Sequence, residues 1–331
     1  MAKRGATSTR AVVWSRIGVA TSLLITGIAI VTLLRFLHDI EPDKVVAALR
    51  AISSQKVLFA GIFVAIVYMT LTLYDFFSLR TIGRHEVPYR VAALAGFTSY
   101  SIGHALGATV FTGGAVRLRI YSAWGLSILE VAKIAFVTGL TFWLGNAFIL
   151  SLSMTFSPEA AAPVTQLPAW INRLVALTGL ASIVAYVVWL LPCPRVIGRA
   201  QWQITLPNAF LTLAQIGIGV MDLSAGALAM YMLLPGKPAL DFLTVLVTYV
   251  MASLLGFLSH APGSLGVFEL VLLVGLSQFE KEDLLGSLLI FRTLYFIAPF
   301  ATALVVLGIR ELWLGARAAT NLQCCNRDPP A

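Results

Sequence analysis

The chain has 331 residues, of which 59% are hydrophobic and only 11% are charged. A soluble domain carries about 25% charged residues because its surface faces water, so the composition excludes an ordinary soluble protein. The formal net charge is +8, but the basic residues are dispersed between apolar runs, which argues against a nucleic-acid-binding arm.

Long apolar runs predict an all-α fold, a polytopic integral membrane helical bundle. Within lipid a spanning segment must satisfy its own backbone hydrogen bonds, and a helix of about 20 apolar residues does so. A membrane β-barrel would instead show alternating segments of about 10 residues. In chain order the eight candidate spans are residues 17–37, 57–73, 91–110, 134–156, 174–191, 209–234, 242–258 and 284–309.

These spans divide the chain into three parts. Residues 1–16 form a basic N-terminus that is expected to be cytoplasmic, residues 17–312 form a transmembrane domain, and residues 313–331 form a short tail. The first span resembles a signal peptide, but no small-residue cleavage site follows it, so a retained helix is expected. Residues 35–56 are amphipathic and are expected on the membrane surface. No connecting segment leaves room for a sizeable soluble domain.

The predicted location is the bacterial inner membrane, with several crossings. If all eight runs cross and the N-terminus is inside, 12 Lys and Arg residues lie on the inner side and 10 on the outer side. This small excess favours an inside N-terminus and an inside C-terminus.

A weak internal repeat relates the two halves of the chain. The segment His104-Ala-Leu-Gly107 recurs as His260-Ala-Pro-Gly263, 156 residues later, and the same shift brings the first four runs close to the last four. A four-plus-four duplication with both halves in the same orientation explains this spacing, and chance similarity within an apolar chain explains it equally well. Transporters built from repeats place their substrate site where the repeats meet.

The first polar interruption contains His104 and Gly107 and continues into a pair of glycines followed by Arg-x-Arg. Paired glycines allow close backbone approach, and free N–H groups beside them favour an anion. The two arginines could bind a phosphodiester in bidentate fashion, or they could extend from a loop to the membrane interface. The candidate site residues here are Gly113, Gly114, Arg117, Arg119 and Tyr121.

The second interruption lies inside apolar sequence. Proline followed by glycines cannot continue a straight helix, so the span over residues 242–276 is predicted to be broken or re-entrant. The breaking residues, and candidate gate elements, are His260, Pro262, Gly263 and Gly266. Such backbone is tolerated at membrane depth only where protein or a water-filled cavity covers it.

Three charged side chains are predicted to lie within the membrane. Glu269 follows the second break, and Arg292 lies in the last span with Tyr295 three residues later on the same face. We expect Arg292 to pair with Glu269, either as part of a polar pathway or merely to lock two helices. Asp222, in the middle of the sixth run, could bind a cationic headgroup, carry a proton or accept a hydrogen bond.

The sequence predicts no cofactor, no metal site and no catalytic residue. Neither His104 nor His260 has further His, Cys or carboxylate residues at metal-binding spacing, and the three cysteines form no Cys-x-x-Cys pair. There is no phosphate-binding loop of the form G-x-x-x-x-G-K-[ST], so any transport is expected to be passive or driven by an ion gradient or the membrane potential.

Together these motifs resemble the membrane domain of the bacterial lysylphosphatidylglycerol synthetase/flippase, the multiple peptide resistance factor. The resemblance spans residues 37–312 and is carried, in order, by LYD at 73–75, SIGHALG at 101–107, GGAVRLRIY at 113–121, WGL at 124–126, PGSLGVFE at 262–269 and RxxY at 292–295. It implies a free-standing flippase-type membrane protein without the family's aminoacyl-transferase domain.

The leading hypothesis is therefore a flippase that moves an anionic or aminoacylated phospholipid, such as phosphatidylglycerol or its lysyl ester, between leaflets. Arg117, Arg119 and Arg292 would meet the phosphate, and Glu269, Asp222 or Asp75 would meet a cationic headgroup. The expected partners are membrane phospholipid, a lipid-synthase protein and a second copy of the chain, with no nucleic acid. Two alternatives stay open: a non-catalytic partner subunit of a separate lipid-modifying synthase or glycosyltransferase, and a membrane-embedded transferase acting on a lipid-linked substrate.

Overall fold

The computed structural model describes residues 42–107, 109–191, 195–198 and 203–325. The predicted first span, the basic N-terminus and residues 326–331 lie outside the described residues. Within these residues twelve α-helices follow one another, namely α2 (Pro42–Ala51), α3 (Ser54–Thr81), α4 (Tyr89–Leu106), α5 (Thr109–Tyr121), α6 (Ile128–Phe156), α7 (Ala162–Thr165), α8 (Ala169–Leu190), α9 (Ala209–Leu233), α10 (Phe242–Ser259), α11 (Val267–Gly275), α12 (Lys281–Arg292) and α13 (Ala298–Cys325).

Short elements connect these helices. The 3-10 turns are η1 (Ser122–Trp124), η2 (Pro158–Ala161) and η4 (Pro262–Ser264), and a π-helical turn, η5 (Thr293–Ile297), joins α12 to α13. Two two-residue strands, β1 (Val196–Ile197) and β2 (Ile204–Thr205), pair antiparallel between α8 and α9.

The polytopic helical membrane fold is confirmed. Among the described residues, six helical segments are long and apolar enough to cross a membrane: Ser54–Thr81, Ile128–Phe156, Ala169–Leu190, Ala209–Leu233, Phe242–Ser259 and Lys281–Trp313. They coincide with six of the eight runs predicted above. Within the predicted amphipathic segment, Pro42–Ala51 form α2, which packs against α12 with Ala48 close to Gly286.

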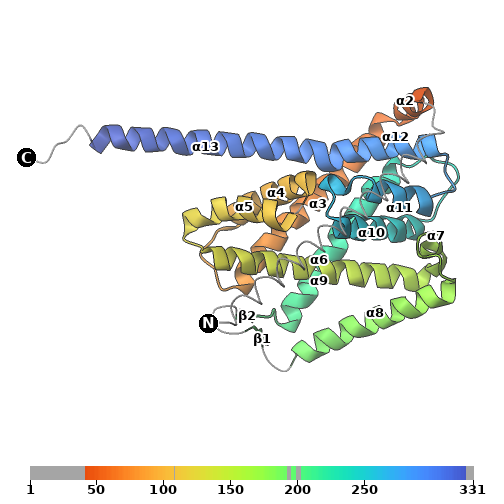
Figure 1. The fold of residues 1–331 in the computed structure, drawn as a ribbon, viewed down its shortest axis with the longest axis horizontal. Helices are drawn as coiled ribbons and strands as arrows, with labels where there is room; N and C mark the ends of the chain where they lie inside the picture. Colours follow the sequence, from red (N-terminus) through yellow and green to blue (C-terminus); the bar gives the residue numbers. More distant parts are fainter. Residues whose placement is uncertain (1–41, 108, 192–194, 199–202, 326–331) are drawn as a thin grey trace, which may run out of the picture.

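The predicted span 91–110 is wrong as a single crossing. The helix α4 ends at Gly107, whose φ of 75° is readily adopted by a residue without a Cβ, and α5 then runs back along α4. A Cβ at Gly113 of α5 would lie only 3.0 Å from the carbonyl oxygen of Ser99 in α4, so the two helices form a tightly packed hairpin. Both ends of this hairpin therefore lie at the same end of the bundle (Figure 1).

The predicted break in 242–276 is confirmed. The helix α10 ends at Ser259, the η4 turn follows, and α11 folds back so that Gly275 lies against Thr248 and Phe268 against Tyr249. Gly266 begins the return helix with a φ of 84°, again in the region that favours glycine. This second helical hairpin approaches the middle of the bundle from the opposite end to the first (Figure 1).

The two hairpins change the predicted sidedness of the basic residues. An ion pair of 2.6 Å joins Arg84, in the turn before α4, to Glu130 at the start of α6. The turns that precede and follow the first hairpin are thus neighbours, and Arg117 and Arg119 lie towards the same end of the bundle as Arg84. Eight crossings would have placed them on opposite sides of the membrane.

The repeat is inverted rather than parallel. In each half a long helix is followed by a hairpin and a second long helix, as α3, α4–α5 and α6, then as α9, α10–α11 and α12–α13. The equivalent helices α3 and α9 pack antiparallel, because Lys56 Nζ bonds the Leu234 carbonyl at 2.8 Å and Thr70 lies against Asp222. The same-orientation prediction fails because the third run does not cross, so that two crossings, α6 and α8, lie between the equivalent helices α3 and α9 instead of three.

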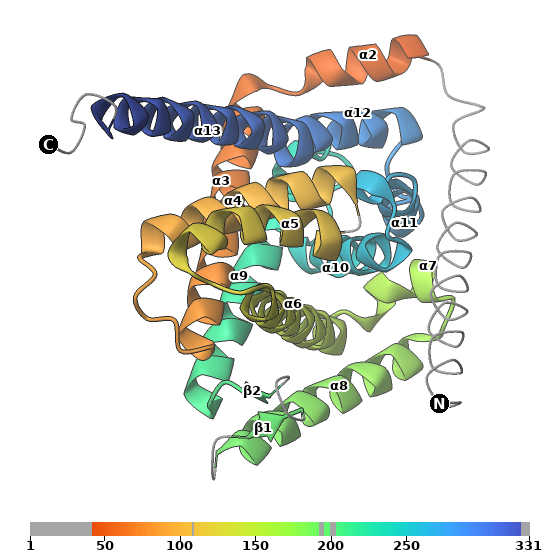
Figure 2. The same ribbon diagram turned by 60° about the vertical axis from the view of Figure 1, so that its left-hand side comes forward.

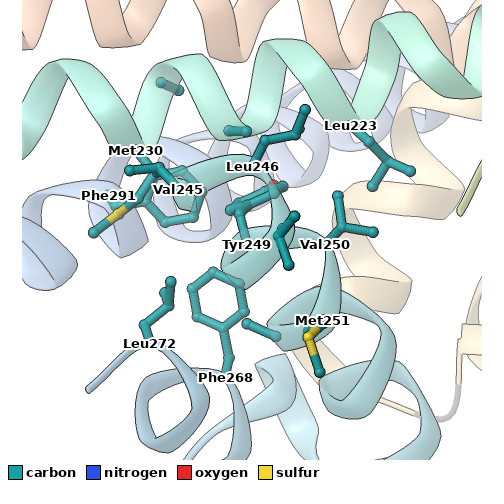
Figure 3. Packing of buried hydrophobic residues seen from close by; sticks show 14 of the residues in the cluster. Leu223, Met230, Val245, Leu246, Tyr249, Val250, Met251, Phe268, Leu272 and Phe291 are labelled. Carbon is teal, nitrogen blue, oxygen red and sulfur yellow. The ribbon is translucent and has the colours of Figure 1, made fainter. Parts of the chain in front are cut away.

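A buried apolar core surrounds the second hairpin. Figure 3 shows Leu223 and Met230 of α9 packed over Val245, Leu246 and Tyr249 of α10. On the other side, Phe268 of α11 stacks on Phe291 of α12 with ring centroids 5.8 Å apart. This packing fixes α11 and α12 against α10, so the turn of the hairpin is held at a defined depth. Figure 2 shows α13 lying across α4, along the outside of the bundle.

Candidate functional site

The tips of the two hairpins meet near the middle of the bundle. The end of α4 contacts the η4 turn, and a Cβ at Gly263 would lie 3.9 Å from the carbonyl oxygen of His104 and 4.0 Å from that of Ala105. The second tip contains two non-glycine residues with left-handed backbone, His260 (φ 53°) and Ser264 (φ 54°). Each such residue costs about 1–2 kcal/mol, so the surrounding contacts must hold this turn in place.

Arg292 provides those contacts. Its Nε forms an ion pair with Glu269 of α11, which confirms the pairing predicted from the sequence. Its Nη1 donates to the Gly263 carbonyl at 3.1 Å, and the Glu269 carboxylate accepts from the Gly266 N–H at 2.8 Å. Its Nη2 is buried and has no hydrogen-bond partner among the described residues. Arg292 thus ties α12 to the tip of the second hairpin and retains one unused donor.

Asp222 lies on α9 beside the tips and is only 6% exposed. The hydroxyl of Tyr74 donates to its Oδ2 at 3.1 Å, and the hydroxyl of Thr70 lies 3.3 Å from its Oδ1. Both neighbours come from α3. In the part of the chain that the structure describes, no Lys or Arg forms an ion pair with Asp222, which distinguishes it from the other buried acidic residues.

A cavity lies where these groups converge. Both hairpin tips, α9, α10 and η5 contribute to its wall, and its polar groups include Asp222, His104, His260 and Tyr295. The rest of the wall is largely aromatic, with Tyr100, Tyr249 and several phenylalanines. The structure therefore brings predicted residues from both halves of the chain, His104, Gly107, His260, Asp222 and Tyr295, to one cavity.

Arg117 belongs to a separate buried cluster next to this cavity. It forms a short ion pair with Asp75 of α3, with Nη2 to Oδ1 at 2.7 Å, and the Tyr121 hydroxyl donates to the same carboxylate at 2.8 Å. The guanidinium lies over the Tyr100 ring at 4.8 Å. Arg117 also lines a smaller adjoining cavity with Tyr100 and His104. A phosphate would have to compete with Asp75 for this arginine.

The remaining predicted residues of the first interruption lie away from the cavity. Arg119 is on the outer face of α5, where it pairs with Glu311 of α13 at 2.7 Å and its side chain is 69% exposed. Gly113 and Gly114 lie inside α5, so the prediction of a glycine loop with free N–H groups is wrong at these positions. Gly113 instead permits the close packing of α5 on α4.

The hydroxyl and aromatic residues around Asp222 were not predicted from the sequence. Thr70 and Tyr74 are four residues apart on α3 and therefore share a face. The signal that could have identified them is the occurrence of polar side chains at helical spacing in and beside an apolar run. No such pattern marks Tyr249, because its position beside Asp222 results only from the packing of α10 against α9.

Comparison with known proteins gives relatives that match this chain over most of their length. The uncharacterized protein slr0712 of Synechocystis is 30% identical over 277 residues, which are 83% of this chain and 86% of the relative. The chain belongs to the family of slr0712. The inner membrane protein YbhN of Escherichia coli is 26% identical over 286 residues, which are 83% of this chain and 86% of YbhN. These relatives and the apolar helices together identify a multi-pass inner membrane protein, as predicted.

A shorter match links the chain to lipid-modifying enzymes. The phosphatidylglycerol lysyltransferase of Staphylococcus haemolyticus is 37% identical over 67 residues, which are 20% of this chain and 8% of that enzyme. The match to the Staphylococcus aureus enzyme has 32% identity over 68 residues. The similarity is therefore narrower than the resemblance over residues 37–312 proposed from the motifs. No family model matches the chain.

Proposed function

We propose that this protein moves a phospholipid between the leaflets of the inner membrane, with an anionic or aminoacylated headgroup passing through the cavity between the hairpin tips. The observation that carries the proposal is the inverted repeat, whose two helical hairpins end at a cavity containing buried charge. Inverted repeats with discontinuous helices that meet near the bilayer midplane are a common transporter design. Polar groups at that depth are costly and are usually retained for function.

The chemistry of the cavity suits a headgroup that carries both signs of charge. Asp222 lines the cavity and offers a carboxylate for an ammonium group. Arg292 is not part of the cavity wall but binds the Gly263 carbonyl in the second tip, and its Nη2, which has no partner among the described residues, would suit a phosphate oxygen. Arg117 and Asp75 would join only if their ion pair opened. The short match to phosphatidylglycerol lysyltransferases supports a phospholipid such as phosphatidylglycerol or its lysyl ester.

Translocation in proteoliposomes tests the proposal. Fluorescent phosphatidylglycerol and its lysyl ester are followed by their accessibility to a membrane-impermeant quencher. Arg292→Gln and Glu269→Gln are expected to slow translocation by about tenfold or more, because a hydrogen bond to a charged group contributes about 1.5–3 kcal/mol and 1.4 kcal/mol corresponds to tenfold. Glu86→Gln serves as the control, since the Glu86 side chain is 53% exposed and pairs with Arg84, away from the cavity lining.

Each variant must first be shown to insert and fold as the wild type does. If the wild type translocates neither lipid, with or without an imposed membrane potential, the proposal is overturned. The partner-subunit hypothesis would then be examined by purifying the protein with its neighbours from native membranes. Full activity of both Arg292→Gln and Glu269→Gln would move the lipid pathway away from this cavity.

A further inference from the structure

The hydrogen-bond pattern around Asp222 indicates which protonation state the site accommodates. A threonine hydroxyl has one hydrogen. In Thr70 the hydroxyl oxygen lies 2.6 Å from the Val67 carbonyl oxygen, which can only accept, and 3.3 Å from Asp222 Oδ1. When the hydrogen is donated to Val67, Thr70 presents a lone pair to Asp222. A carboxylate oxygen cannot donate to that lone pair, whereas a carboxylic acid O–H can.

The other oxygen of Asp222 completes this arrangement. Tyr74 donates to Oδ2 at 3.1 Å, so the acid form accepts one hydrogen bond at Oδ2 and donates one at Oδ1. The carboxylate form instead requires Thr70 to turn its only hydrogen away from Val67. Both states can therefore be accommodated by the rotation of one hydroxyl group, which is suitable for a group that gains and loses a proton.

Among the residues that the structure describes, those that face Asp222 provide no permanent countercharge. Tyr68 and Tyr74 approach from α3, Tyr100 from α4, Tyr249 from α10 and Tyr295 from η5, all close enough to interact with its charge. His104 and His260 line the same cavity. Arg117 and Arg292 are paired with Asp75 and Glu269. At membrane depth an unpaired carboxylate is costly, and uptake of a proton removes that cost.

We infer that Asp222 is a proton-binding site that links lipid translocation to the transmembrane proton gradient. In the step itself a proton adds to the Oδ1 carboxylate oxygen to form an O–H bond and later leaves, with no other bond made or broken. Asp222 lies on α9 against α3, the equivalent helix of the other half, and beside both hairpin tips. A change in the charge of Asp222 would therefore favour one packing arrangement of the two halves of the protein over another. The inference rests on the proposed function.

The experiment measures the distribution of a tracer lipid in proteoliposomes under a pH gradient. The membrane potential is clamped with valinomycin and potassium. One proton per lipid supports about a tenfold asymmetry of the tracer for each pH unit, since one unit corresponds to about 1.4 kcal/mol. The wild type and Glu86→Gln should reach this asymmetry. Asp222→Asn, whose amide can donate to Thr70 and accept from Tyr74 as the acid does, should give a ratio near one.

Infrared difference spectroscopy of the wild type as a function of pH provides a readout that does not depend on transport. A protonated carboxylic acid band should appear as pH falls and be missing in Asp222→Asn. Active translocation with no response to the pH gradient, or dependence on a sodium gradient instead, overturns the inference and leaves the proposed function intact. Absence of all translocation overturns the proposed function. Independently of transport, proton binding by Asp222 is overturned if the wild type shows no such infrared band, or if the band persists in Asp222→Asn.

Discussion

Substitution of Arg117 by alanine is expected to destabilise the protein by about 3–5 kcal/mol, because it leaves the Asp75 carboxylate buried without its countercharge. The side chains of Arg117 and Asp75 are 4% and 0% exposed, and three nitrogen–oxygen contacts of 2.7–3.1 Å join them. The free energy of unfolding in mixed detergent micelles measures the effect. Tyr121 would still donate to Asp75, but a single hydroxyl does not neutralise a charge.

Arg119 provides a matched control only two residues away. It also pairs with a carboxylate at 2.7 Å, but the side chains of Arg119 and Glu311 are 69% and 41% exposed. Arg119→Ala should therefore cost less than about 1 kcal/mol. The double variant Asp75→Asn/Arg117→Met should recover part of the loss, since no buried charge is left unpaired. Equal effects of Arg117→Ala and Arg119→Ala would show that water reaches the Asp75 pair.

Substitution of Gly219 by leucine is the second change with a large expected effect, a destabilisation of about 3 kcal/mol or more. Gly219 of α9 and Gly145 of α6 face each other, and a Cβ on either would lie 2.7 Å from the Cα of the other. Neither helix backbone can move away without disturbing the packing around Asp222, three residues further along α9. Small residues allow such close approach between membrane helices.

Gly217 lies on the exposed side of the same helix and has nothing within 4 Å of an added Cβ. Gly217→Leu should leave stability unchanged or raise it by up to about 1 kcal/mol, because leucine forms helices better than glycine. The two variants thus differ in the sign of their effect on the free energy of unfolding. A similar small effect for Gly219→Leu would mean that α6 and α9 do not pack as closely as described.

The apolar runs were sufficient to predict most of the fold. The runs predicted the position of α6, α8 and α9 closely, because a helix in lipid must be long and apolar over its whole length, whereas α3 extends well beyond the predicted run at 57–73. Residues 91–110 were misread for the same reason: the run is as long as a crossing, and only the backbone of Gly107 shows that the chain turns there. That one error also gave the repeat the wrong orientation, because each extra crossing reverses every helix after it.

The candidate site was predictable where residues lie close in sequence to a break. The pairing of Glu269 with Arg292 was predicted correctly because a charged side chain within the membrane is costly unless it pairs with one of opposite sign. Arg117 and Arg119 could not be told apart from the sequence, since the distinction depends on which face of α5 meets α3. The cavity itself depends on contacts between His104 and Gly263, far apart in the chain, and no local pattern encodes such a contact.

Cross-linking of the two hairpin tips tests most directly whether lipid passes through the region where they meet. Ala105→Cys and Ser264→Cys would be introduced after replacement of Cys193, Cys324 and Cys325, and joined by a bifunctional, reducible thiol reagent. The end of α4 and the η4 turn are in contact, so the reagent can span them, and mass spectrometry establishes the link. Translocation should stop when the tips are linked and return on reduction, while each single-cysteine variant is unaffected. Undiminished translocation by fully linked protein would contradict the proposed pathway.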